Sequence, residues 1–317
     1  MRLLKLIIIP ISIFVISCSD NDVVDNNDVI DDIPVVVSEQ IRQVVESVNI
    51  DSIKTTLEIL TGVKPYIING DTITIKSRHA NFSGNDHAAD YLEHRLKNYG
   101  YEVVNQNFDT RGRNVYAILE GSEKPDEYYI ICAHYDSMPE SIMSPGADDN
   151  GSGTSAVIEA ARIFSKLNPE YSIIFALWDE EEQGLFGSKY FAEHAENINM
   201  KIKGVINMDM IGWDSNNDYY LRLAVPNPDV EYPIITKSKE INTGMNLGLQ
   251  ILIVNSNVAS DHASFLSRGY QAYCFIEDNL DFNGFYHSTN DQMQFINFTY
   301  YNKNCKVIIG ALASLTL

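Results

Sequence analysis

Histidine and acidic residues follow apolar runs at several points of the sequence. The segment IIFALWDEEEQGLFGS, from Ile173 to Ser188, passes from an apolar run straight into four consecutive acids at positions 179–182. Carboxylates packed this closely repel one another, so they favour a nearby cation. His134 and Asp136 in AHYDS, and Asp209 in NMDMIG, also stand at the ends of apolar runs. Imidazole and carboxylate groups bind divalent metal ions, so a metal site is the first chemistry to consider.

Two further segments carry residues of the same types. PGADDNGSG contains Asp148 and Asp149, and FYHSTND contains His287. Each segment alone has an ordinary structural explanation: a turn with a helix N-cap for the first, a packed or exposed histidine for the second. The acidic run alone is typical of a solvated loop, and His134 with Asp136 of a solvent-facing strand end. Only their placement together in the fold distinguishes a site from these alternatives.

Strand-like and helix-like segments alternate along the chain. Apolar runs predict strands over 128–135, 172–178, 204–210, 249–254 and 272–277. Helical spacing is found over 87–100, 153–167, 185–196 and 231–244, and two antiparallel strands are expected over 101–108 and 113–121. This alternation predicts an α/β fold with three layers, α/β/α, in which helices cover both faces of a central mixed, mainly parallel sheet.

The predicted sheet brings the candidate ligands together. The strands 128–135, 172–178 and 204–210 end in His134, the acidic run and Asp209, and ligands gather at the carboxyl ends of such strands. Two imidazoles with carboxylates and no thiolate point to zinc, with manganese or cobalt as substitutes. Two ions about 3.5–4 Å apart would activate water and polarise a carbonyl, and a further carboxylate would act as general base. Spacing alone does not decide which of the consecutive acids takes part.

The N-terminal segment 1–18 carries a targeting pattern. Arg2 and Lys5 precede an apolar run from Leu6 to Ile16, and Cys18 follows. The run is shorter than the roughly 20 residues of a membrane-spanning helix, which predicts a secretory signal peptide. Its end, VISC, resembles the lipobox of bacterial lipoproteins, although an ordinary signal peptide that ends near a cysteine is the alternative. We therefore expect an exported protein, lipid-anchored to the periplasmic or cell-surface face of the bacterial envelope and attached to the membrane only through this lipid.

The amino-acid composition predicts a tether that is followed by a single domain. Residues 19–35 are acidic and poor in core-forming side chains, which predicts a flexible tether, and residues 36–317 fit one domain. The chain has 43 acidic and 23 basic residues, and this negative charge argues against a nucleic-acid partner. Beyond Cys18, three cysteines allow at most one disulfide, and buried thiols are expected at Cys132, Cys274 and Cys305.

Six motifs occur in the order found in a known family. HYDS, PGADDNGSG, EEQGLFGS, NMDMIG, SDHASF and YHSTND resemble those of the dinuclear zinc aminopeptidases of the bacterial leucyl aminopeptidase and aminopeptidase S type. The resemblance extends from about residue 75 to about residue 315. It implies two Zn²⁺ per chain and a zinc-peptidase domain over 36–317. The implied ligands are His134, Asp149 and Asp209 for one ion, and Asp149, Glu182 and His287 for the other.

The resemblance also implies roles for neighbouring residues. Asp149, rather than Asp148, would bridge the two ions, and Glu181 would be the general base. Asp179 and Glu180 would then be ordinary polar residues. Histidines without a ligand counterpart in the family are read as structural or exposed: His79, His87, His194 and His262.

Supporting roles are expected for several residues beside the ligands. Ligand histidines usually donate their second ring nitrogen to a carboxylate or carbonyl, which makes Asp136, Asp261 and Asp291 candidates. Asp136 is the foremost, because it lies two residues along the strand from His134 and shares its face. Tyr286 is expected either to hydrogen-bond the tetrahedral oxyanion or to be a packed aromatic residue.

The activity implied is the hydrolytic removal of the N-terminal residue from peptides with a free N-terminus. Large apolar first residues are a common preference among relatives. Glutaminyl-peptide cyclotransferases share the fold and several ligand positions but use a single zinc, and they form the first alternative. The second alternative is a non-catalytic lipoprotein that binds metal or peptide. Glu181 argues against the latter, because a binding protein does not require a base beside its ligands.

Overall fold

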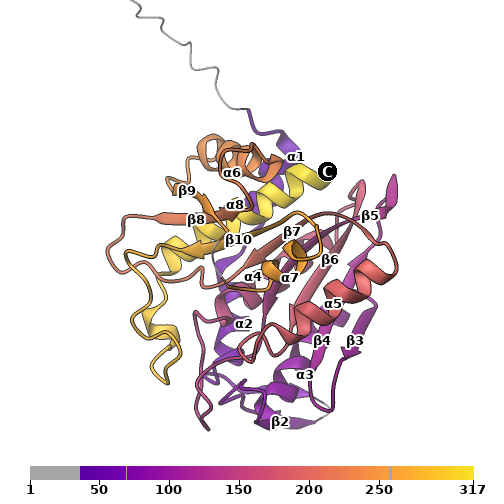
Figure 1. Cartoon of the computed structure of the whole chain (residues 1–317). Helices are drawn as coiled ribbons and strands as arrows, with labels where there is room; N and C mark the ends of the chain where they lie inside the picture. Colours follow the sequence, from indigo (N-terminus) through magenta and orange to yellow (C-terminus); the bar gives the residue numbers. More distant parts are fainter. Residues whose placement is uncertain (1–35, 69, 257–258) are drawn as a thin grey trace, which may run out of the picture. The chain divides into compact units, whose positions relative to one another are not determined.

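A mixed sheet forms the centre of the computed structural model, which describes residues 36–68, 70–256 and 259–317. The segments predicted as signal peptide and tether, 1–18 and 19–35, lie outside the described residues. The strand order is β3-β4-β6-β5-β7-β10-β8-β9 (Figure 1). The bounds are β3 Val103–Asn107, β4 Arg113–Leu119, β5 Lys124–His134, β6 Tyr171–Trp178, β7 Lys201–Met208, β8 Tyr220–Val225, β9 Gln250–Asn255 and β10 Ala272–Glu277.

Parallel pairing dominates the middle of this sheet. β5 pairs in parallel with β6 and β7, and β7 pairs in parallel with β10. β4 is antiparallel to both β3 and β6, while β8 is antiparallel to β10 and parallel to β9. The prediction of a mixed, mainly parallel sheet is confirmed. A separate two-stranded ribbon joins β1, Tyr66–Ile68, to β2, Asp71–Ile73.

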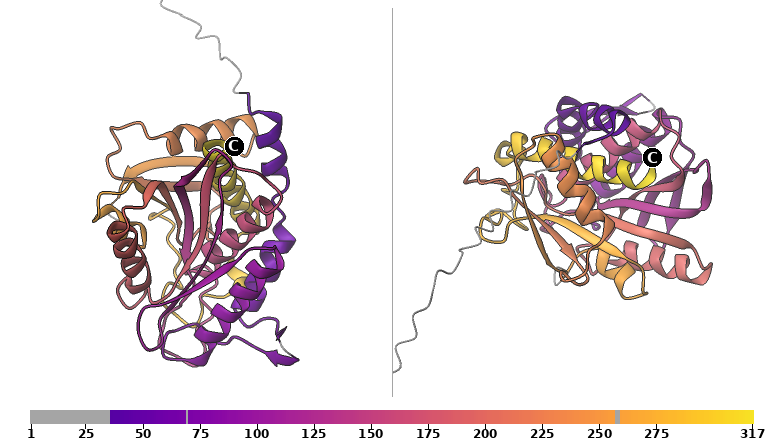
Figure 2. Two further views of the ribbon diagram at one scale, coloured as in Figure 1. Left: turned by 90° about the vertical axis from the view of Figure 1, so that its right-hand side faces the viewer. Right: turned by 90° about the horizontal axis from the view of Figure 1, so that it is seen from above.

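Helices cover both faces of the sheet (Figures 1 and 2). Alternate strand residues separate the two cores: Ile130 and Cys132 pack with Phe191 of α5 and Phe265 of α7, whereas Ile131 packs on the opposite face. That opposite core includes residues of α1 to α4, α6 and α8. The helix bounds are α1 Glu39–Glu46, α2 Ile50–Leu60, α3 Ser83–Asn98, α4 Gly151–Phe164, α5 Phe186–Asn197, α6 Pro233–Gly244, α7 His262–Leu266 and α8 Phe298–Thr316, with a 3₁₀ turn at Met293–Phe295. The three-layer α/β/α prediction is therefore confirmed.

Two other sequence expectations concern the cysteines and membrane spans. Cys132, Cys274 and Cys305 are free and buried, as expected for packed thiols. Among the described residues, no helix combines the length and the apolar character that a membrane crossing requires.

Trp178 allows a test of the packing between the sheet and α5. Its side chain is fully buried, with its ring centroid 4.9 Å from that of Phe191 and 6.1 Å from that of Phe265. Trp178→Ala should lower the free energy of unfolding by about 3–5 kcal/mol, because it removes a large buried ring. Chemical denaturation measures this change. Ile198→Ala, at a side chain 53% exposed, is the control and should change stability by less than about 0.5 kcal/mol; equal effects would contradict this packing.

Candidate metal centre

The carboxyl ends of β5, β6 and β7 deliver acidic and imidazole groups to one edge of the sheet. His134 is the last residue of β5 and lies in register with Trp178, the last residue of β6. The acidic run follows Trp178 directly, and Asp209 follows the last residue of β7. These three strands therefore end beside one another, as the sequence predicted.

Two loops complete the cluster. Asp149 stands before α4, whose N-cap residue Asn150 accepts a hydrogen bond from the Gly153 amide at 2.8 Å and donates one to the Met208 carbonyl at 2.8 Å. These bonds tie the start of α4 to the end of β7. His287 comes from the segment that follows β10. The structure brings all five expected ligands together, in two groups that share Asp149.

The first group contains His134, Asp149 and Asp209. The Nε2 atom of His134 lies 3.4 Å from Oδ1 of Asp149 and 3.5 Å from Oδ1 of Asp209. Ligands at about 2.0–2.1 Å from a tetrahedral zinc lie about 3.3 Å apart. The spacing of these atoms therefore suits a shared ion.

The second group contains Asp149, Glu182 and His287. The Nε2 atom of His287 lies 3.3 Å from Oδ2 of Asp149 and 2.8 Å from Oε2 of Glu182. Asp149 thus turns one carboxylate oxygen toward each group. Glu181 lies beside them, with its Oε2 atom 4.0 Å from Nε2 of His134, and the described residues also place it in a third group with His134 and Glu182.

The atoms that face each other in the cluster lack ordinary partners. Within the described residues, buried atoms without a hydrogen bond include Nε2 of His134, Oδ2 of Asp149, Oε1 of Glu182, Oδ1 of Asp209 and Nε2 of His287. Buried polar atoms are normally paired, so a set of this kind fits a site that binds a cation. The donors are imidazole nitrogen and carboxylate oxygen without thiolate, and such a set fits zinc or a similar divalent ion.

The electrostatics of the cluster lead to the same conclusion. Burial raises the pKa of Glu181 to about 10 and that of Glu182 to about 8, and neighbouring carboxylates add to both shifts. Burial lowers the pKa of His287, but the carboxylates of Asp149 and Glu182 outweigh it and raise that pKa to about 10. With the protein groups alone, protons would have to balance the negative charge. Divalent cations would replace those protons and hold the acids ionised.

Asp136 holds both a histidine and the acidic turn. Its Oδ1 atom lies 3.1 Å from Nδ1 of His134, and this contact leaves Nε2 directed into the cluster. The same carboxylate accepts hydrogen bonds from the Glu181 amide at 3.2 Å and the Glu182 amide at 3.1 Å. Asp136 is thus placed as the sequence led us to expect.

The contacts of Asp291 and Asp261 are not the expected ones, because the sequence predicts that each accepts a hydrogen bond from a ligand histidine. Asp291 accepts the backbone amides of Asp148 at 3.1 Å and Asp149 at 2.9 Å, because its carboxylate lies under the loop that precedes α4. Asp261 is buried at the start of α7, and no hydrogen bond joins it to His134 or His287 within the described residues. Its charge instead contributes to the raised pKa of Glu181.

Asp179 is not the ordinary polar residue that the resemblance implied. Its side chain is buried and accepts hydrogen bonds from Nδ2 of Asn85 at 2.8 Å and the Arg113 amide at 3.0 Å. Asp148 is also buried, and its Oδ1 atom accepts the Gly212 amide at 2.8 Å. Sequence reasoning missed both roles because their partners lie in distant segments. Four histidines were expected to be structural or exposed, and none joins the cluster: His79, His87, His194 and His262.

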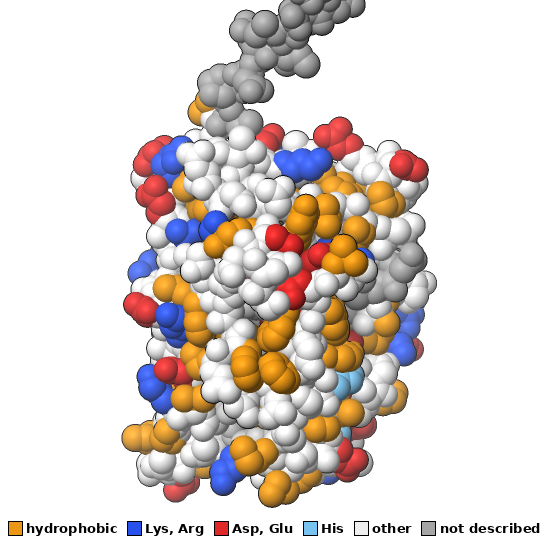
Figure 3. All heavy atoms as spheres, turned by 90° about the vertical axis from the view of Figure 1, so that its left-hand side faces the viewer, with side chains coloured by type: hydrophobic (Ala, Val, Ile, Leu, Met, Phe, Trp, Pro, Cys, Tyr) orange, Lys and Arg blue, Asp and Glu red, His pale blue; other side chains and the backbone are white. Residues whose placement is uncertain are grey.

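Exposed apolar side chains lie near His287 in the sequence. Tyr286 is 45% exposed and its ring stacks on that of His287, with centroids 3.7 Å apart. Phe282 packs edge-on against Tyr286 at 5.2 Å, and Leu280 is largely exposed. The face in Figure 3 shows hydrophobic side chains gathered around shallow hollows.

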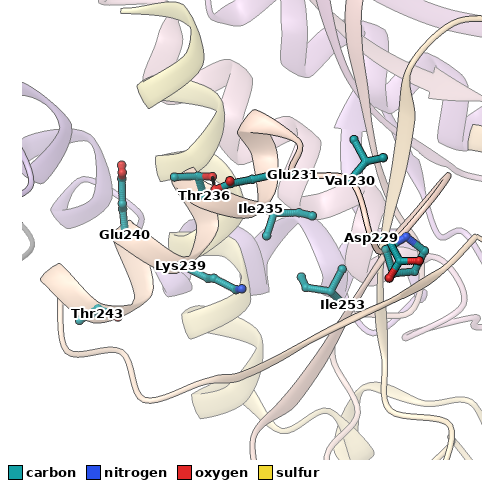
Figure 4. Close-up of a pocket in the computed structure, with 10 residues that line it drawn as sticks. Asp229, Val230, Glu231, Ile235, Thr236, Lys239, Glu240, Thr243 and Ile253 are labelled. Atoms are coloured by element: carbon teal, nitrogen blue, oxygen red, sulfur yellow. Dashed lines mark hydrogen bonds between the residues drawn. The ribbon is translucent and has the colours of Figure 1, made fainter. Parts of the chain in front are cut away.

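A separate cavity of about 370 Å³ lies between α6 and β9 and is drawn in Figure 4. Its lining includes Ile235, Lys239 and Ile253 and contains no residue of the cluster.

A three-layer sheet with imidazoles and carboxylates clustered at its carboxyl edge is typical of metal-dependent enzymes. The model of peptidase family M28 matches residues 114–312, and the chain belongs to this family. It is therefore a peptidase, and the resemblance noted in the sequence is confirmed. Its membership and relatives support a zinc-dependent enzyme.

Two relatives and two solved structures illustrate the similarity. A probable zinc metalloprotease of Leptosphaeria maculans is 25% identical over 88% of this chain and 77% of its own length. Aminopeptidase YwaD of Bacillus subtilis is 31% identical over 54% of this chain and 37% of its own length. The LapA aminopeptidase of Legionella pneumophila has a TM-score of 0.73 at 23% identity, covering 88% of this chain and 76% of that one. A glutaminyl cyclase of Bacteroides thetaiotaomicron has a TM-score of 0.68 at 17% identity, covering 84% and 98%.

These matches differ in how much of each relative they cover. The chain spans between 48% and 77% of the length of the first four fungal zinc metalloproteases that it matches. The two solved structures are less than 25% identical to it, and their similarity shows the fold.

Zinc should stabilise the folded chain through this cluster. Adding Zn²⁺ to metal-free protein is expected to raise the midpoint of thermal unfolding, because the ions bind the folded cluster and not the separated side chains. Free zinc at 100 times its dissociation constant adds about 2.7 kcal/mol per site. Calorimetry measures the shift. Asp149→Asn should abolish most of it, whereas Glu159→Gln, at a buried carboxylate of α4, should retain it; a wild-type midpoint indifferent to zinc would refute the site.

Proposed function

We propose that the protein is a dinuclear zinc aminopeptidase that hydrolyses N-terminal residues from peptides. The main observation behind this proposal is the orientation of Asp149. Its Oδ1 atom lies 3.4 Å from Nε2 of His134, and its Oδ2 atom lies 3.3 Å from Nε2 of His287. A carboxylate in this position suits a bridge between two ions. The family membership and the similarity to aminopeptidase YwaD support the exopeptidase activity.

The residues divide between metal binding and proton transfer. His134 and Asp209 would hold one Zn²⁺, Glu182 and His287 the other, and Asp149 both; Mn²⁺ or Co²⁺ are possible substitutes. Bound zinc would polarise the scissile carbonyl and lower the pKa of water. Asp136 keeps the Nε2 atom of His134 free to act as a ligand, since Nδ1 is engaged at 3.1 Å.

Glu181 is the proposed general base. It lies in the same turn as Glu182, but its carboxylate lies toward His134 rather than between Asp149 and His287. In the proposed reaction, Glu181 takes a proton from the attacking water as the new carbon–oxygen bond forms. It then delivers that proton to the departing amine as the peptide bond breaks. The products are one free amino acid and a peptide shortened by one residue.

Substrate binding is proposed on the apolar side of the cluster. Phe282 is partly exposed and packs against Tyr286, whose ring stacks on that of His287, and this position would suit the side chain of an apolar first residue such as leucine. The carboxylates beside the cluster suit a free α-amine. Tyr286 is the proposed donor to the oxyanion that develops on the scissile carbonyl, since its partly exposed ring stacks on that of His287.

Export and anchoring remain proposals that rest on the sequence. The basic start, short apolar run and VISC ending of residues 1–18 support a signal peptide cleaved before Cys18. A lipid on that cysteine would then hold the peptidase at the periplasmic or cell-surface face of the bacterial envelope. The acidic segment 19–35 would separate the domain from that surface.

Replacing Glu181 should remove catalysis and leave metal binding intact. Glu181→Gln is expected to lower kcat about 10²–10⁴-fold, because the amide cannot accept the proton of water. Hydrolysis of a leucine chromogenic amide measures this effect, with and without a chelator, beside zinc analysis of the same samples. Glu180→Gln, which changes the adjacent acid, is the control and should retain activity. Wild-type turnover in Glu181→Gln would exclude Glu181 as the base.

The product from a peptide with N-terminal glutamine separates hydrolysis from cyclisation. The glutaminyl cyclase similarity shows that this fold hosts another chemistry, so the alternative merits a direct test. We expect mass spectrometry to detect free glutamine and a shortened peptide, because Asp149 faces two ligand groups rather than one. Loss of ammonia from an otherwise intact peptide would instead establish a cyclotransferase.

A further inference from the structure

We propose that Asp179 is a positioning residue, which fixes the turn that presents Glu181 and Glu182 to the cluster. The inference rests on the proposed function, because it assigns a task to a residue outside the ligand set and outside the proton transfer. Asp179 immediately follows β6 and stands two residues before Glu181. A displacement of the Asp179 backbone would therefore also displace Glu181 and Glu182.

The carboxylate of Asp179 joins three separate segments. Its Oδ1 atom accepts hydrogen bonds from Nδ2 of Asn85 on α3 at 2.8 Å and from the Glu180 amide at 2.9 Å. Its Oδ2 atom accepts the amide of Arg113, the first residue of β4, at 3.0 Å. Asp179 is only 1% exposed, so water does not replace these partners easily.

Each of these three partners is a hydrogen-bond donor. Asp179 must therefore present acceptors on both oxygens, which a carboxylate does and a carboxamide does not. In Asp179→Asn, the new NH₂ group would face either Arg113 or the pair formed by Asn85 and Glu180. Two donors would then oppose each other in a buried site, and the turn would have to shift to separate them.

The backbone of Asp179 is held by a second contact set. Its amide donates to Oδ1 of Asn114 at 3.1 Å, and its carbonyl accepts the Gly187 amide at 3.0 Å. Nδ2 of Asn114 donates to the Gly187 carbonyl at 2.9 Å. A Cβ atom on Gly187 would overlap both the side-chain oxygen of Asn114 and the carbonyl oxygen of Asp179. The chain therefore contacts Asp179 again at Gly187, so the start and the end of the turn pack against each other.

Between these two ends, Asp136 is the other anchor of the turn. It accepts the amides of Glu181 and Glu182 at 3.2 and 3.1 Å. Within the turn, the Glu181 carbonyl accepts the Gly184 and Leu185 amides at 2.9 and 2.7 Å. Asp136 thus fixes the middle of the turn, and the contacts of Asp179 and Gly187 fix where it begins and ends.

Two variants test whether Asp179 fixes the turn: one changes its carboxylate, and the other disturbs its backbone contact with Gly187. Asp179→Asn removes an acceptor, and Gly187→Ala introduces the overlap without changing any charge. Alanine favours a helix more than glycine does, so helix propensity in α5 does not account for a loss in Gly187→Ala. Glu159→Gln is the matched control, because Glu159 is a buried carboxylate that accepts the Asn49 amide at 2.7 Å away from the cluster.

The readouts are kcat and KM on a leucine amide, zinc affinity by competition with a chelator, and thermal unfolding of the full chain. In both variants we expect kcat to fall about 10²-fold at nearly constant KM. We expect the zinc site that contains Glu182 to lose about 10- to 100-fold in affinity. Glu159→Gln should lower the unfolding midpoint while kcat and zinc affinity stay at wild-type values.

Each outcome bears on the proposal. Wild-type kcat and zinc affinity in a folded Asp179→Asn, or losses no larger than those of Glu159→Gln, would overturn it. So would a failure of both variants to fold, since Asp179 would then serve folding rather than the turn. If wild-type protein binds two zinc ions but cleaves no peptide, the proposed function fails, and zinc affinity alone decides the role of Asp179. A wild-type chain that binds no zinc overturns both.

Discussion

Repulsion among buried carboxylates is the constraint on which the rest of the structure depends. Asp149, Glu182 and Asp209 point toward common centres from three segments, and Glu181 lies beside them. Burying several like charges is strongly unfavourable unless opposite charge compensates them. The two imidazoles supply at most two positive charges. The fold therefore suits a state in which divalent cations occupy these centres.

The scaffold compensates part of this cost with hydrogen-bond donors. Asp136 and Asp291 are buried carboxylates, and each accepts two backbone amides of residues in or beside the ligand set. Arg78 is a fully buried cation whose guanidinium donates to the carbonyls of Tyr135 at 2.6 Å, Leu60 at 2.9 Å and Gly146 at 2.8 Å. It thereby fixes the loop that leads to Asp149 and places one positive charge near the acids. Burial lowers the pKa of Arg78 to about 10, which leaves it charged at neutral pH.

The elements that the sequence predicts best are the strands whose apolar runs end in candidate ligands. Strands β5, β6 and β7 are short apolar runs that stop at polar residues, so both the strands and the placement of His134 and Asp209 could be predicted. Helix α8 was not predicted, because consecutive residues from Val307 to Ala313 are buried and no polar face marks it. Asp179 was misjudged since its partners Asn85 and Arg113 lie 94 and 66 positions away. The choice of Asp149 over Asp148 required the family resemblance, because adjacent aspartates have the same chemistry.

Direct metal analysis tests the central claim that cations balance the crowded carboxylates. The chain should be purified, stripped with a chelator, reloaded with zinc and freed of excess metal, and zinc should then be counted per chain. The account predicts about two zinc ions in wild-type protein and about one in His287→Ala, which removes a ligand of a single group. One ion in wild-type protein would contradict a paired centre, and none would contradict the whole account of the cluster.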